Sequence, residues 1–280
     1  MIATTAAVAR DLLREARARK WTIALLGGVT LLLGLAGLGL ELDVVDGALA
    51  ASRLFGGTML DDGLRAADVA LRPLFEAVAF VVFHGGLLLG VLACADFAPA
   101  LLAPGRVEHL LALPVRRAEV VLGTFLGVEA LVLGGALYGG LGLSLIVWGK
   151  TGVFGLAPVA AALLAAAGFA AIYAVMIAAA LVARSAALSA AAGAALYVAG
   201  LIAGNRALLA PLFARGVSRQ VFLLLTAPVP RLSELGRHAQ RVANGLPLDG
   251  AQLAVQVGGT ALFAAAALAA AIALFERKDF

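Results

Sequence analysis

The sequence predicts an all-α integral membrane protein that forms a single unit over residues 1–280. Hydrophobic residues make up 63% of the chain and charged residues 14%, whereas soluble domains have about 45–50% and 25%. Six apolar runs are each long enough to cross a bilayer, which takes about 20 helical residues. No short alternating strands typical of a membrane barrel are visible, so helices are the economical way to pair backbone groups in lipid.

The six apolar runs define the expected transmembrane helices. The third is long enough to tilt, or to break near Gly139-Gly140 and re-enter the membrane. Between the fourth and fifth runs only "ARSAA" intervenes, so Arg184 predicts a tight hairpin turn. The first run spans about twenty residues and follows a long charged segment, which favours an uncleaved span over a signal peptide. The runs cover residues 21–40, 73–95, 119–148, 157–182, 187–204 and 251–275.

The distribution of Lys and Arg predicts that both termini are cytoplasmic. Six spans place the termini on one side, and the 1–20 segment carries five basic residues, whereas the 41–72 loop is rich in Asp and Glu. One region argues the other way, because the 205–250 loop would be external and contains six arginines. Long loops obey the charge rule poorly, so the assignment with both termini inside is kept.

The 1–20 segment resembles a helix that lies in the membrane interface. Val8, Leu12, Leu13 and Ala16 recur at helical spacing, and the basic residues of this segment occupy another face. A basic amphipathic helix of this kind lies on the membrane and turns into the first span at Trp21. An ordinary positively charged cytoplasmic flank is the alternative.

A polar segment over residues 96–118 interrupts the apolar sequence between the second and third spans. Val107, Leu110 and Leu111 form an i, i+3, i+4 stripe between prolines, with Arg106 and His109 alongside. A helix of about two turns is too short to be stable alone. It therefore needs either lipid headgroups or a groove on a cytosolic partner.

The sequence carries no recognisable catalytic site. His84, His109 and His238 fall on a span, on the 96–118 segment and on the 205–250 loop, so they cannot share a metal, and neither HExxH nor GxSxG occurs. The Gly149-Lys150-Thr151 tripeptide lacks the first glycine of a phosphate-binding loop. The chain is therefore expected to be non-enzymatic, with no cofactor or metal of its own. A net charge of +4 without a dense basic patch argues against nucleic acid as a partner.

Three residues inside the spans stand out. Glu76 and Glu129 lie in otherwise apolar sequence, where a charge costs roughly 2.5–3.5 kcal/mol, so such residues usually face protein or water. They are candidates either for contacts with substrate or helix interfaces or for structural pairs. The single cysteine, Cys94, is expected to be a small buried apolar residue.

An amphipathic basic segment precedes the first span, "APGRVEHLLALPVRRAEVVLGTFLG" follows the second, and "FERKDF" closes the chain. This order of features resembles the ABC-2 type permeases, the membrane subunits of ABC exporters, with the NosY-like subgroup the most similar. The family pattern of a glycine, paired leucines, a P-V-x-R element and LGK-F is matched by Gly105, Leu110-Leu111, Pro114 to Arg117 and Leu122 to Phe125. Thr124 stands where the family usually has lysine.

The resemblance implies a function for the 96–118 segment. It would be the coupling region, docked on a separate cytosolic ATPase subunit that binds ATP and Mg²⁺, and two permease copies, expected to be a homodimer, would work with two ATPases in a bacterial inner membrane. The 205–250 loop would bind an extracytoplasmic protein or substrate, or act as a lid. The docking residues implied are Arg106, Val107, Glu108, His109, Leu110, Leu111, Pro114, Arg116 and Arg117.

Two other functions are compatible with the sequence. The same architecture can pass ATPase motion to an extracytoplasmic partner without moving solute, as a mechanical or assembly component. A secondary transporter would show inverted repeats and several polar residues at the membrane midplane, and neither is clear here.

Overall fold

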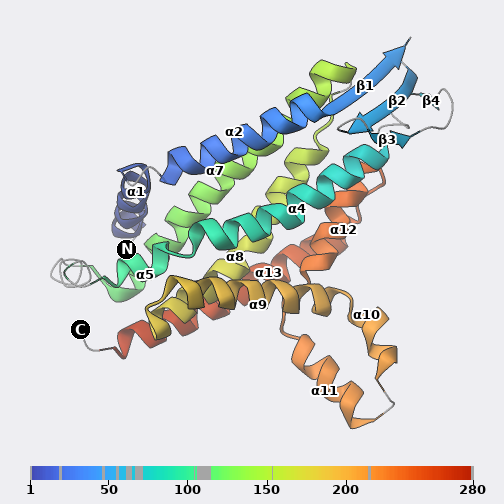
Figure 1. Ribbon diagram of the computed structural model, residues 1–280. Coiled ribbons are helices and arrows are strands. Elements are labelled where there is room, and N and C mark those ends of the chain that lie inside the picture. The colour runs from blue at the N-terminus through green and yellow to red at the C-terminus, as the bar shows by residue number, and fades with distance from the viewer. Residues whose placement is uncertain are drawn as a thin grey trace.

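The computed structural model describes residues 2–18, 21–45, 48–54, 57–60, 65–66, 72–103, 105, 115–152, 154–213 and 216–278. Long helices form a bundle, with both chain termini at one end and the strands at the other (Figure 1). These two ends are called the terminal end and the sheet end below. The short helix α5 (Phe97–Leu101), which begins the predicted coupling region, also lies at the terminal end.

Each of the six predicted apolar runs forms a helix. Five of these helices are long and apolar enough to cross a membrane, and the sixth, α2, contains a shorter apolar stretch, Leu26–Leu38. The third run is continuous through Gly139-Gly140, so the alternative of a break there is wrong. The helices are α2 (Trp21–Gly39), α4 (Arg72–Cys94), α7 (Arg117–Thr151), α8 (Ala157–Ala183), α9 (Ala186–Gly204) and α13 (Gly250–Glu276).

Helix α8 lies at the centre of the bundle, in contact with α4, α7, α9 and α13. Its alanine-rich sequence has little side-chain bulk, and glycines on three neighbours allow close approach. A Cβ added at Gly90 would lie 2.8 Å from Phe169, one at Gly140 2.9 Å from the Val159 backbone, and one at Gly193 2.8 Å from Met176. Small residues therefore set the spacing of the core.

The predicted hairpin between the fourth and fifth spans is confirmed. Helix α8 ends at Arg184, which takes the left-handed conformation with φ of 49°. Ser185 then caps α9, where its side chain accepts a hydrogen bond from the backbone N–H of Leu188.

The basic N-terminal segment forms helix α1 (Ile2–Ala18), and its apolar stripe packs on protein. Leu12 and Ala16 are buried, and α1 lies along α7. Cβ atoms added at Gly123 and Gly127 would lie 2.6 Å from Val8 and 3.1 Å from the Ala9 carbonyl oxygen. The stripe that suggested an interfacial helix therefore docks on a glycine face of α7.

A small antiparallel sheet occupies part of the region that the sequence suggests to be an acidic loop. Strand β1 (Leu40–Val45) pairs with β2 (Ala48–Leu54), which also pairs with β3 (Gly57–Leu60) and β4 (Arg65–Ala66). The membrane-spanning part remains all-helical, as predicted, and the sheet is an addition at its end (Figure 1).

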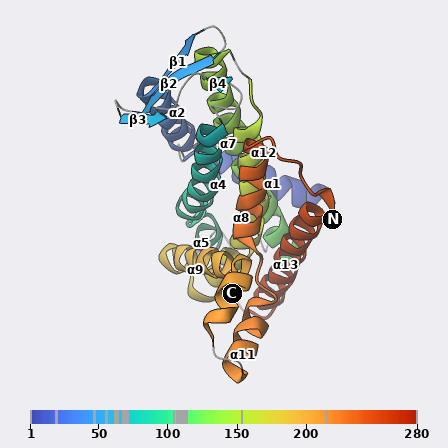
Figure 2. The same ribbon diagram turned by 90° about the vertical axis from the view of Figure 1, so that its right-hand side faces the viewer.

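The 205–250 loop is mostly helical. It contains α10 (Arg206–Leu209), a 3-10 turn η1 (Ala210–Leu212), α11 (Val217–Thr226) and the amphipathic helix α12 (Leu232–Ala243). Helix α12 packs against α4, α8 and α9, whereas α10, η1 and α11 project from the bundle (Figures 1 and 2). The predicted single outer loop therefore has two parts with different surroundings.

Candidate functional site

The predicted coupling region is described at its two ends. Helix α5 begins it, Gly105 lies in a turn with φ of 81°, and Arg116 and Arg117 lead into α7. Seven of the nine predicted docking residues lie outside the described residues, namely Arg106, Val107, Glu108, His109, Leu110, Leu111 and Pro114. Their docking role stays a prediction.

Arg116 and Glu119 form the start of α7. The Glu119 carboxylate accepts a hydrogen bond from the Arg116 backbone N–H at 3.0 Å, which is the reciprocal contact of a capping box. Glu119 is buried and also hydrogen-bonded by the Thr4 side chain of α1. The end of the coupling region is thus fastened to α1 as well as to α7.

Arg117 holds the last turn of α13 from the first turn of α7. Its Nη1 atom donates to the carbonyl oxygens of Phe275, Glu276 and Lys278 at 2.9, 2.9 and 2.6 Å. Its guanidinium also lies 5.8 Å from the centre of the Phe275 ring. The final carbonyls of a helix have no partner within it and carry its negative dipole end, so an arginine is well matched to them. These contacts are called the terminal clamp.

Lys278 extends the terminal clamp to α8. Its ammonium group donates to the carbonyl oxygen of Leu181, in the last turn of α8. The polar contacts therefore connect the end of the predicted coupling region, the end of α13 and the end of α8.

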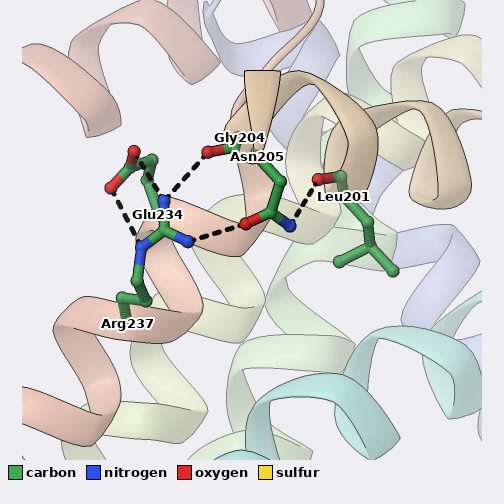
Figure 3. Close-up of polar contacts among 5 residues, drawn as sticks. All are labelled: Leu201, Gly204, Asn205, Glu234 and Arg237. Carbon is green, nitrogen blue, oxygen red and sulfur yellow. Dashed lines mark hydrogen bonds and ion pairs between the residues drawn. The ribbon is translucent and has the colours of Figure 1, made fainter. Parts of the chain in front are cut away.

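A second arginine fastens α12 to the end of α9 (Figure 3). Arg237 donates from Nη2 to the Gly204 carbonyl oxygen and from Nη1 to the Asn205 side chain, both at 2.9 Å. Asn205 itself donates to the carbonyl oxygen of Leu201, and Glu234 forms a salt bridge of 2.7 Å with Arg237. These contacts are called the α12 latch. It again places a cation on the C-terminal carbonyls of a helix.

Close packing reinforces the α12 latch. A Cβ at Gly200 would lie 2.6 Å from Leu232 and 3.0 Å from the Pro230 carbonyl oxygen, and one at Gly204 would lie 2.0 Å from the Ser233 hydroxyl. Leu232 and Leu235 are fully buried. Helix α12 therefore packs closely on α9, because its side chains occupy the space that a Cβ atom at Gly200 or Gly204 would need.

The predicted candidate Glu76 belongs to the same region. Its carboxylate accepts a hydrogen bond of 3.1 Å from the Asn244 amide, just beyond the end of α12. Further along α4, His84 Nδ1 lies 3.0 Å from the Tyr197 hydroxyl of α9. Two polar contacts thus join α4 to the α9 and α12 side of the bundle, so Glu76 lies at a helix interface.

Glu129, the other candidate, lies elsewhere in the bundle. Its Oε1 atom is buried and has no hydrogen-bond partner, and the same is true of the Tyr173 hydroxyl. The Tyr173 ring stacks between Phe125 and Phe169, and Cys94 is fully buried. Glu76 and Glu129 therefore lie in different surroundings, and the expectation that Cys94 is buried is confirmed.

The described histidines do not gather. His238 is buried in α12, its Nδ1 atom has no hydrogen-bond partner, and burial lowers its pKa. His84 lies on α4, and within the described residues no group of three or more His, Cys, Asp or Glu side chains is placed to hold a metal ion.

Sequence reasoning missed the two residues that organise the helix ends, Arg237 and Lys278. Arg237 is one of six arginines in the 205–250 loop, and its spacing from Glu234 indicates only a surface pair. Lys278 is part of the closing "ERKDF" motif, and basic residues near a helix end favour its carbonyls. A partner helix cannot be read from either pattern.

No protein-family model matches this chain, and no curated protein matches it either.

Proposed function

We propose that this chain is the permease subunit of an ATP-driven ABC exporter of the ABC-2 type, powered by a separate cytosolic ATPase. The observation that carries the proposal is the position of the predicted coupling region. Its described ends lie at the terminal end of the bundle, and Arg116 and Arg117 at the second of these ends begin α7. The chain is a six-span protein in this proposal, with α2 as the first span and both termini cytoplasmic.

The terminal clamp supports this function because it distributes a local displacement. A motor that moved the 105–117 segment would pull on α7, through Arg117 on α13, and through Lys278 on α8. Helix α8 contacts most of the other long helices. A docking segment connected in this way suits a subunit that receives motion and has no nucleotide site of its own.

The test is to disrupt docking without disturbing the membrane part. The proposal predicts that an ATPase gene neighbours the gene of this chain. We expect that replacing Leu110 and Leu111 with glutamate leaves membrane insertion intact and abolishes co-purification of that ATPase. Leu246→Glu with Leu248→Glu is the matched control, because both leucines are exposed between α12 and α13, away from the terminal end. Undiminished co-purification of the Leu110/Leu111 variant would count against the proposal.

Mechanical transmission without solute transport is the second candidate, and the α12 latch favours it. Helix α12 is fastened to α9 by Arg237 and to α4 through Glu76, so motion of either span moves an element of the extracytoplasmic loop. Reconstituted vesicles distinguish the two functions. ATP-dependent solute movement favours the exporter, whereas a bound extracytoplasmic protein with no transport favours mechanical transmission.

A further inference from the structure

Helix α1 carries a row of arginines that its own chain leaves exposed. Arg10, Arg14 and Arg17 are spaced by four and three residues, so their side chains lie on one face of the helix. All three side chains are exposed, and within the part of the chain that the structure describes none of them forms a hydrogen bond or an ion pair. These three residues are called the arginine stripe.

The arginine stripe lies opposite the surface through which α1 packs on α7. Leu12 and Ala16 are buried in that packing. Because a helix turns by about 100° per residue, Arg14, which is two residues from each of them, lies about 160° around the axis from both. Arg10 is likewise two residues from Leu12. The stripe therefore faces away from α7.

The two flanks of the arginine stripe differ in polarity. Asp11 and Glu15, which are four residues apart, lie between the stripe and α7 on one side of the helix. Ala6 and Leu13, which are seven residues apart and half-buried, lie between the stripe and α7 on the other side. An amphipathic helix at a membrane surface turns its apolar flank towards the acyl chains and its charged flank towards water. Arginines between these flanks lie at the depth of the headgroup phosphates.

The position of α1 along α7 gives the same depth. Helix α7 has 35 residues and is about 52 Å long, whereas the hydrocarbon core of a bilayer is about 30 Å thick. About 10 Å of α7 therefore extends beyond the core at each end when it spans symmetrically. Helix α1 packs on Gly123 and Gly127, which lie about 9 and 15 Å from the start of α7. The contact thus falls where the headgroups meet the hydrocarbon core.

The orientation of α1 suits this place. Both views show α1 crossing the direction of the long helices at the terminal end (Figures 1 and 2). Its chief contacts are with α7 and α2, so it lies at the edge of the bundle. A helix at this depth that crosses the spans lies along the membrane surface, with its outward face towards the neighbouring lipid.

We propose that the arginine stripe binds the phosphate groups of anionic phospholipids in the leaflet at the terminal end of the bundle. Guanidinium groups bind phosphate through paired hydrogen bonds, and basic residues at a membrane surface attract anionic lipid. The sequence suggested that the apolar stripe of α1 contacts the membrane, whereas here the opposite, arginine-bearing face makes that contact. The inference depends on a chain that spans a membrane and does not depend on the proposed ATPase.

Competitive lipid binding to the full chain tests the proposal. The purified protein is mixed with equal amounts of phosphatidylglycerol and phosphatidylcholine, and the retained lipids are counted by native mass spectrometry. We expect about a tenfold preference for phosphatidylglycerol, which weakens as the salt concentration rises. Arg10→Gln with Arg14→Gln and Arg17→Gln should abolish the preference. No preference in the unaltered chain, or an undiminished preference in this variant, would overturn the proposal.

Two further variants separate the stripe from net charge and from folding. Lysine at the same three positions keeps the charge and should retain most of the preference. Glutamine at Arg206, Arg231 and Arg241 removes the same charge outside α1 and should leave the preference unchanged. An equal loss in this second variant would show that net charge selects the lipid, and loss in the lysine variant would show that the attraction is not electrostatic. Either result refutes the stripe as the binding surface.

Fluorescence quenching locates the bound lipid. Ala7→Cys places a fluorophore one turn before Arg10, in a chain that also carries Cys94→Ala to remove the single native thiol. Spin-labelled phosphatidylglycerol should quench it about twice as strongly as spin-labelled phosphatidylcholine, because the stripe enriches the anionic lipid locally. A fluorophore at Leu246→Cys, away from the terminal end, should be quenched equally by both lipids. Equal quenching at Ala7→Cys would refute the inference.

An acidic protein surface is the other class of partner that could pair with these arginines. If the unaltered chain shows no preference for phosphatidylglycerol and the glutamine variant of the stripe loses the ATPase, the stripe binds that protein and the lipid is refuted. Failure of the Leu110 and Leu111 test refutes the proposed function alone, because lipid binding is measured without the ATPase.

Discussion

The terminal clamp and the α12 latch use the same chemistry at different places in the bundle. In each, an arginine from one helix donates to the last carbonyls of another, Arg117 to α13 and Arg237 to α9. The surroundings differ. At the latch, Glu234 forms an ion pair with Arg237, and side chains of α12 occupy the space beside Gly200 and Gly204. At the clamp, Arg117 contacts the last turn of α13 and the residue just beyond it.

This difference indicates how each joint works. Where packing holds two helices together, the arginine mainly satisfies carbonyls that would otherwise be unpaired. At the clamp, Arg117 joins α7 to the end of α13 through three hydrogen bonds, so we expect its loss to loosen that joint. We therefore expect a rigid joint at α12 and a joint that can open at the terminal end, where the predicted motor would act.

The largest expected effect is at the packing of the α12 latch. Gly200→Ala places a methyl group 2.6 Å from Leu232 and 3.0 Å from the Pro230 carbonyl oxygen. Overpacking of this kind costs about 2–3 kcal/mol, measured as the free energy of unfolding in mixed micelles. Gly28→Ala on α2 is the matched control, because its added Cβ meets nothing within 4 Å. Equal stability of the two variants would show that packing does not hold α12.

The second effect is at the terminal clamp. Arg117→Ala removes three contacts to the end of α13, and we expect a loss of about 2 kcal/mol, because hydrogen bonds from charged donors contribute more than neutral ones. Arg117→Lys should recover less than half of this loss, since an ammonium group lacks the planar fork of a guanidinium. Full recovery by lysine would mean that charge alone holds the clamp.

The two joints also show what the sequence can and cannot predict. All six long helices were predicted, because each depends on the composition of one local run. The clamp joins residues 158 positions apart and the Arg237 to Gly204 contact joins residues 33 apart, so neither is visible in any local pattern. Gly123 and Gly127 stand four residues apart, a spacing that chance readily gives in a chain with 33 glycines, yet in the fold both pack against α1.

The sheet was missed for a different reason. The acidic residues of β1 suggested a solvated loop, although Asp46-Gly47 between "LELDVV" and "ALAASRL" is a common hairpin signal. Strand pairing places Val45 opposite Ala48, so the two strands flank that dipeptide. The coupling residues Arg106 to Leu111 lie outside the described residues, and for them the sequence prediction still stands alone.

A smaller effect is expected for the arginine of the latch. The Arg237 side chain is 44% exposed, and exposed ion pairs contribute about 0–1 kcal/mol. Arg237→Ala should therefore cost about 1 kcal/mol or less, clearly below the cost of Arg117→Ala in the same unfolding assay. If Arg237→Ala lowers the free energy of unfolding as much as Gly200→Ala does, then polar contacts hold the latch as they hold the clamp, and the two joints do not differ in this way.

The smallest effect is a pH dependence that only the latch side should show. Burial lowers the pKa of His238 in the folded chain, whereas the unfolded chain has the ordinary value near 6.5. Below that value the unfolded state binds more protons than the folded state, so this residue's contribution to stability falls as the pH falls from about 6.5 towards the lowered pKa. His238→Gln should reduce the difference in unfolding free energy between pH 7.5 and pH 5.5.

The control is Arg117→Ala, which should leave that difference unchanged. The contacts that it removes join a guanidinium group to backbone carbonyl oxygens, and neither group titrates in this pH range. An unaltered pH dependence in His238→Gln would mean that this buried ring does not set the pH response of the α12 side.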